Sequence, residues 1–66
     1  MDNSALRRVW VIQDKITGCF LHLDLYLTKS LKDAGRAPDP LCARETADMN
    51  INGPYEIHSF YEPIED

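Results

Sequence analysis

The stretch that decides the fold is LRRVWVIQDKITGCFLHLDL, residues 6–25. Its first part, residues 6–13, is rich in Val, Ile and Trp, which are residue types that favour a β-strand. Asp14 opens a short polar segment that closes on Gly18. Because glycine adopts a positive φ at no steric cost, this segment predicts a hairpin connection with Gly18 at the left-handed position.

Residues 19–25 are expected to form the returning strand of this hairpin. The side chains alternate in type, as they do in a strand with one face on the core. The face expected to point into the core carries Cys19, Leu21, Leu23 and Leu25. The opposite face carries Phe20, His22 and Asp24.

A helix is predicted from Pro40 to about Asn50. Asp39 can accept hydrogen bonds from free backbone N–H groups, and proline suits the first helical position. The inward side would carry Cys42, Ala43, Thr46, Ala47 and either Met49 or Asn50. Gly53 is expected as the C-terminal cap residue, and Pro54 bars continuation.

Two further elements flank this helix. A short helical turn is predicted within residues 28–34, capped by Thr28 or Ser30 and ended by Gly35. Residues 55–62 alternate as a third strand, which Pro63 ends.

The predicted fold class is therefore α+β: a single small domain over residues 1–66 with the order ββαβ. An antiparallel three-stranded sheet would carry one helix packed on one face, which is the natural two-layer arrangement. The second sheet face would be uncovered. Its expected side chains are Trp10, Ile12, Phe20, His22, His58 and Phe60.

Length and charge exclude several function classes. A chain of 66 residues is too short for a barrel or nucleotide-binding enzyme fold, and its core is expected to be only marginally stable without a partner or a second copy. The net charge is −4. Residues 1–36 hold six basic and four acidic side chains, whereas residues 37–66 hold one basic and seven acidic ones. An acidic half of this kind attracts basic surfaces and repels nucleic acid.

The sequence predicts no membrane span, no secretory signal and no cofactor. No apolar run reaches the length of a spanning helix, and no basic segment precedes an apolar one near the start. Two cysteines are too few for a disulfide scaffold, so we expect a cytoplasmic protein of the host cell.

Two chemical alternatives use the same side chains. Cys19, His22, Cys42 and His58 are of the types that bind zinc, but their spacing fits no zinc-finger pattern, and buried thiols with half-exposed imidazoles are the simpler interpretation. A Cys–His nucleophile lacks an electropositive niche, because Asp39 and Glu45 flank Cys42. The sequence therefore predicts no enzyme activity and no metal site.

Binding surfaces remain. Arg7, Arg8, Trp10 and Lys15 could form a nucleic-acid platform on the first hairpin, although arginines paired with the C-terminal acids explain the pattern more simply. An acidic surface with aromatic anchors would instead imitate nucleic-acid phosphates for a basic protein groove. The candidate partner-binding residues are Glu45, Asp48, Glu56, Glu62, Trp10, Phe60 and Tyr61.

The run VWVIQDKITGCFL, residues 9–21, resembles the opening of many small phage and prophage proteins, which share a strand, an Asp-Lys-x-Thr-Gly turn and then Phe-Leu. The segment LKDAGR at residues 31–36, the helix with Ala43 and Ala47, and the strand beginning at Tyr55 extend the likeness. The resemblance implies a protein of the host-inhibitor type, similar to inhibitors of CRISPR effectors, RNA polymerase or nucleases.

The leading functional hypothesis is therefore a non-enzymatic phage or mobile-element protein. It would bind and inhibit a host protein that handles nucleic acid and offers a basic surface. The alternatives are a homo-oligomeric structural or regulatory protein, in the simplest case a homodimer, and a nucleic-acid-binding module that uses the first hairpin.

Overall fold

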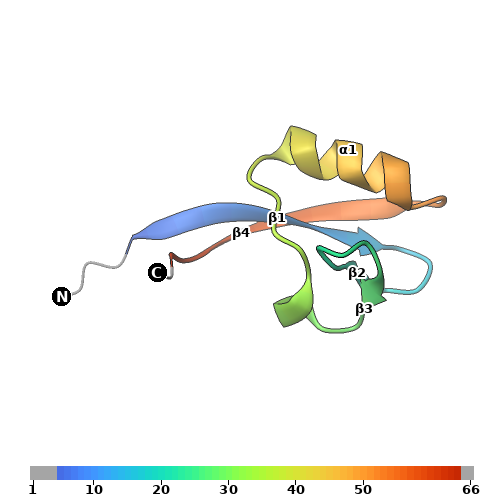
Figure 1. Ribbon diagram of the computed structural model, residues 1–66, viewed down its shortest axis with the longest axis horizontal. Helices are drawn as coiled ribbons and strands as arrows, with labels where there is room; N and C mark the ends of the chain where they lie inside the picture. The colour runs from blue at the N-terminus through green and yellow to red at the C-terminus, as the bar shows by residue number, and fades with distance from the viewer. Residues whose placement is uncertain (1–4, 65–66) are drawn as a thin grey trace.

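The fold is built on a long two-stranded ribbon. In the computed structural model, which describes residues 5–64, β1 (Leu6–Asp14) and β4 (Tyr55–Pro63) pair antiparallel along their whole lengths. The short strands β2 (Phe20–Leu21) and β3 (Leu27–Thr28) complete an antiparallel sheet in the order β3-β2-β1-β4 (Figure 1). The α+β class is confirmed, but the sheet has four strands where three were predicted.

The first hairpin forms as predicted. Gly18 has a φ of 77°, and its N–H donates to the Asp14 carbonyl at 2.8 Å. The Asp14 carboxylate accepts a hydrogen bond from the Ile16 N–H at 2.9 Å, which is an Asx turn. The connection is therefore closed by the two residues that the sequence singled out.

The returning strand is much shorter than residues 19–25. Only Phe20 and Leu21 pair as a strand, because the chain turns again where the Leu25 N–H donates to the His22 carbonyl at 2.8 Å. Leu25 closes this turn with a φ of 70°. The prediction of a buried leucine face is wrong beyond Leu21, since Leu23 is 74% and Leu25 55% exposed.

The helix α1 (Pro40–Asn50) has the predicted bounds. The Asp39 carboxylate caps it by accepting from the Cys42 N–H at 2.7 Å. Ala43 and Ala47 are fully buried, and their small side chains let α1 lie close to the sheet. The predicted glycine cap is wrong, because the C-cap residue that follows Asn50 is Ile51, in an extended conformation.

The expectation of an uncovered second sheet face is also wrong. Trp10 and Ile12 pack on the α1 side, so the alternate residues Val9 and Val11 point to the other side. They are nevertheless 2% and 0% exposed. The chain between β3 and α1, with a 3-10 helix η1 (Leu31–Asp33), lies on that side of the sheet and covers it (Figure 1).

This covering segment returns to the helix side along the edge of β1. The N–H of Gly35 donates to the Leu21 carbonyl at 2.9 Å, and Ala37 exchanges two hydrogen bonds with Trp10 at 2.8 and 3.1 Å. A side chain at Gly35 would meet the Leu23 backbone nitrogen at 2.9 Å. Glycine is required there by close approach of two backbones, whereas the sequence suggested a helix end.

The predicted helical turn before Gly35 is present as η1. Ser30 stands at its N-cap position but makes no side-chain cap hydrogen bond. The carbonyls of Leu31 and Lys32 are instead bound by Arg36, three residues after the end of η1. Over residues 5–64, no helix is long and apolar enough to cross a membrane.

Candidate protein-binding surface

Four side chains from the two long strands form a contiguous patch beside the start of α1. Arg8 lies opposite Tyr61, and Trp10 lies opposite Ser59. The Arg8 guanidinium carbon is 5.1 Å from the Trp10 ring centre and 5.9 Å from that of Tyr61. Its Nη2 and Nε donate to the Ser59 hydroxyl at 3.0 and 3.3 Å. We call these four residues the Arg8–Tyr61 surface.

β1 and β4 extend beyond α1 toward the two chain ends (Figure 1), and the Arg8–Tyr61 pair lies toward that end of the two strands. Tyr61 is 65% exposed and Arg8 is exposed, whereas Trp10 is half-buried because it also contacts the core. A guanidinium between two aromatic rings gains a cation–π attraction of about 0.5–1 kcal/mol at an exposed site. These contacts and the two bonds to Ser59 therefore favour the observed position of the Arg8 side chain.

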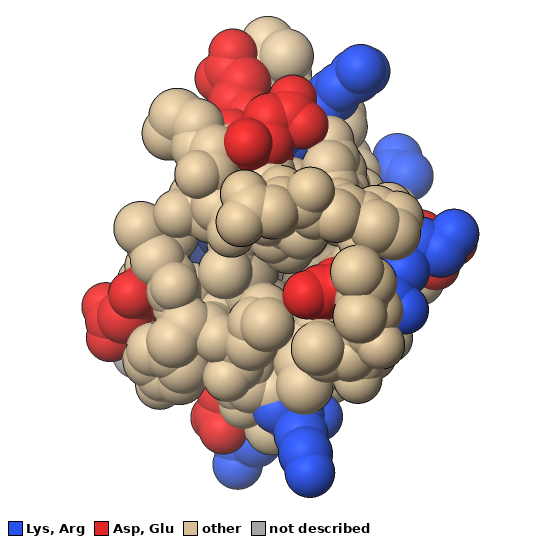
Figure 2. Space-filling model, turned by 90° about the vertical axis from the view of Figure 1, so that its right-hand side faces the viewer, with Lys and Arg blue, Asp and Glu red and all other residues tan. Residues whose placement is uncertain are grey.

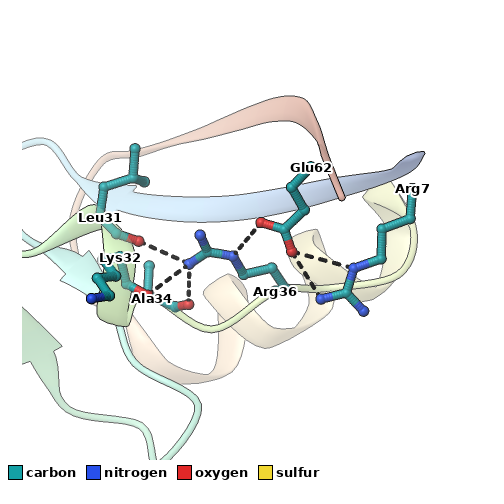
Figure 3. Close-up of polar contacts among 6 residues, drawn as sticks. All are labelled: Arg7, Leu31, Lys32, Ala34, Arg36 and Glu62. Carbon is teal, nitrogen blue, oxygen red and sulfur yellow. Dashed lines mark hydrogen bonds and ion pairs between the residues drawn. The ribbon is translucent and has the colours of Figure 1, made fainter. Parts of the chain in front are cut away.

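On the opposite side of the ribbon, Glu62 joins two arginines (Figure 3). Its Oε2 accepts from Arg7 Nη2 at 2.8 Å and Nε at 3.2 Å, and its Oε1 accepts from Arg36 Nε at 3.1 Å. Hydrogen bonding to Arg7, followed by that to Arg36, holds the pKa of Glu62 below its ordinary value. The sequence expectation that arginines of β1 pair with C-terminal acids is thus correct for Arg7.

Arg36 also fastens η1 to the sheet. Its Nη1 donates to the carbonyls of Leu31, Lys32 and Ala34, at 2.8, 3.3 and 2.6 Å (Figure 3). Its guanidinium carbon lies 5.5 Å from the ring centre of Phe60. Arg36 therefore satisfies carbonyls at the end of η1 and links them to β4.

The seven candidate partner-binding residues do not share one face. Glu45 and Asp48 are exposed on α1, and Trp10 and Tyr61 lie on the same side of the sheet as α1. The other three, Glu56, Phe60 and Glu62, lie on the η1 side because they alternate with Tyr61 along β4. The structure brings Trp10 and Tyr61 together and separates them from Phe60.

Several acidic side chains already have partners within the chain. Asp39 caps α1, Glu62 binds two arginines, and Asp48 accepts from the Tyr55 hydroxyl at 2.6 Å. The bond to Asp48 is the main reason that the pKa of Tyr55 is raised above its ordinary value. Viewed from the first-hairpin end, the acidic groups stand apart, with one gathering at the top over α1 (Figure 2).

The basic residues of the first hairpin also separate. Arg7 and Arg8 point to opposite sides of β1, and Lys15 lies at the far end of that strand. They do not form one nucleic-acid platform. Cys19 and Cys42 are free thiols, and over residues 5–64 no three His, Cys, Asp or Glu side chains are placed to hold a metal ion.

A small apolar pocket of about 210 Å³ lies between α1 and the turn at residues 22–25. Its walls include Trp10, Leu23, Leu25 and Cys42. At the turn, the His22 and Tyr26 rings stack with their centres 4.2 Å apart. The exposed leucines therefore border a recess that shares Trp10 with the Arg8–Tyr61 surface.

Sequence reasoning grouped Arg8 with Trp10 only as part of a possible nucleic-acid platform, and it missed the contacts of Ser59 and Arg36. The signal for Arg8 was present as a basic residue two positions before a tryptophan on a strand, which puts both on one face. Its contacts with Ser59 and Tyr61 depend on the register between two strands about fifty residues apart in sequence. No local pattern specifies that register.

No protein-family model, curated protein or solved structure matches this chain.

Proposed function

We propose that this chain is a non-enzymatic protein that binds another protein through the Arg8–Tyr61 surface. The observation that carries the proposal is the Arg8 guanidinium, which contacts both the Trp10 and the Tyr61 ring on an exposed part of the ribbon. Trp, Tyr and Arg are the residue types that contribute most binding energy at protein interfaces. A side chain that is already ordered also loses less conformational entropy on binding.

The partner that we propose is a host protein with a basic, nucleic-acid-binding surface, as for an inhibitor encoded by a phage or mobile element. The net charge of −4 and the exposed carboxylates of Glu45 and Asp48 on α1 support this class of partner. These two residues lie on the same side of the sheet as Tyr61, but Asp48 bonds to Tyr55 at the other end of β4, so the two acids act by long-range attraction and not by contact at the Arg8–Tyr61 surface. Glu56 and Glu62 lie on the opposite side and are not part of this contact.

Quantitative capture tests the proposal. The immobilised protein is exposed to host lysate, and the captured proteins are compared with those retained by the Arg8→Ala and Tyr61→Ala variants. Because both substitutions truncate an anchor, we expect retention of the specific partner to fall about tenfold or more. Glu45→Lys should reduce retention most at low salt, since it acts through steering.

Ile16→Ser is the matched control, because Ile16 is exposed at the tip of the first hairpin, far from the Arg8–Tyr61 surface. This variant should retain the same proteins as the unmodified chain. Circular dichroism and thermal unfolding establish that each variant is folded. Equal capture by all folded variants contradicts the proposal.

A further inference from the structure

Within residues 5–64, no strand pairs with the outer edge of β4, so its outward backbone groups are available for hydrogen bonding. Trp10 uses its N–H and C=O to pair with Ala37, so these groups point away from β4. Its cross-strand partner Ser59 must then point its own N–H and C=O away from β1. By the period of two, the backbone groups of Tyr55, Ile57 and Tyr61 point outward as well.

This edge has few of the features that usually prevent strands from pairing, and its acidic side chains are Glu56 and Glu62. β4 is nine residues long, is the terminal strand of the described sheet, and keeps an unbroken register with β1. It contains no Lys or Arg, and its one proline stands at the end, at Pro63. Long unprotected edges of this kind are templates for another strand.

We infer that β4 pairs antiparallel with β4 of a second copy of this chain. The register that pairs the whole strand places Ser59 opposite Ser59 of the second copy, because Ser59 is the central residue of Tyr55–Pro63. This register sets Ile57 beside Tyr61 on the α1 side and His58 beside Phe60 on the η1 side. Both are apolar or aromatic pairs that favour cross-strand contact.

Charge supports the same register. Glu56 of one copy would stand opposite Glu62 of the other, on the η1 side. Glu62 already binds both Arg7 and Arg36, so two positive charges and one negative charge meet there. The incoming Glu56 carboxylate therefore approaches a site with a local positive charge, and the pair is attractive where two bare glutamates would repel.

The arrangement continues the sheet across both copies. A two-fold axis at Ser59 perpendicular to the sheet keeps both α1 helices on one side, and both Arg8–Tyr61 surfaces with them. The dimer would therefore present two contact surfaces to one partner. This last consequence rests on the proposed function, whereas the pairing itself does not.

Analytical ultracentrifugation over a concentration series tests the pairing. The unmodified chain should form a dimer, and Ser59→Pro should weaken the dimer at least about tenfold, because it removes an outward N–H that β1 does not use. Ser59→Ala is the control, since it loses the Arg8 contact but keeps the N–H and should remain dimeric. A monomer at every concentration, or equal dimerisation of folded Ser59→Pro, overturns the inference.

A disulfide locates the interface. With Cys19 and Cys42 replaced by Ser, Ser59→Cys should oxidise to a covalent dimer, since directly paired residues have Cα atoms about 5.5 Å apart. Glu56→Cys should not, because the two copies of residue 56 would be roughly 20 Å apart. A dimer that fails to cross-link at residue 59 overturns the edge pairing. A monomer that still captures its partner leaves the proposed function intact, so the two failures are distinguishable.

Discussion

At the scale of single residues, Leu25 is the clearest departure from what its type favours. A φ of 70° is unusual for a residue with a branched aliphatic side chain, and glycine or asparagine normally occupies this closing position of a three-residue hairpin loop. The side chain is 55% exposed, so burial does not offset the backbone strain. Leu25 therefore stores unfavourable energy at the rim of the apolar pocket.

Leu25→Asn should stabilise the protein by about 1 kcal/mol, because asparagine tolerates the left-handed conformation that leucine resists. Urea unfolding followed by tryptophan fluorescence measures the change. Leu23→Asn is the control, since Leu23 is exposed in the same turn without a positive φ. Equal effects of the two substitutions would show that lost apolar surface, and not backbone strain, determines the result.

The structural roles that could be predicted from sequence are those that depend only on neighbouring residues. Gly18 and Asp39 each satisfy a local backbone requirement, and both were identified from sequence. Gly35 and Leu25 could not be assigned in this way. A glycine is needed at position 35 because the Leu23 backbone packs against it. Leu25 adopts a positive φ that its residue type does not indicate.

At the scale of elements, α1 and the two long strands could be predicted, whereas the segment between β3 and α1 could not. The helix has a cap and a proline at its start, and the strands have a composition of their own. The covering of the second sheet face depends on Arg36, which joins η1 to Glu62 of β4. That contact crosses twenty-six positions in the chain and leaves no periodic signal.

The ion pairs of Glu62 predict an acid-sensitive contribution to stability. Its folded-state pKa is lowered, so the contribution is present above the pKa of the unfolded chain and is lost as the pH falls through the folded-state pKa. Glu62→Gln should therefore be less stable than the unmodified protein at neutral pH. The difference should narrow as the pH falls below 4.5, the ordinary value for a glutamate.

Chemical denaturation at a series of pH values measures this difference. Glu45→Gln is the control, because Glu45 is exposed on α1 and binds neither Arg7 nor Arg36. Its stability relative to the unmodified chain should change little with pH. A Glu62→Gln difference that stays constant down to low pH is inconsistent with the ion-pair assignment.

In the molecule as a whole, the fold places acidic and aromatic side chains that are close together in the sequence on opposite sides of the sheet. The acidic half predicted one electrostatic face, but alternation along β4 sends Glu56 and Glu62 to the side opposite Tyr61. The candidate site was therefore predicted in part, through Trp10 and Tyr61. Arg8 completes it only because the β1–β4 register places it opposite Tyr61.

Photo-cross-linking from the Arg8–Tyr61 surface is a direct test of the claim that this surface contacts another protein. A benzophenone amino acid replaces Tyr61, or Ile16 as the control, and each protein is irradiated in host lysate. We predict that position 61 forms an adduct with a protein other than a second copy of the 7.6 kDa chain, as identified by mass spectrometry. Position 16 should form no such adduct. Adducts only with a second copy, or equal adducts at both positions, would contradict the claim.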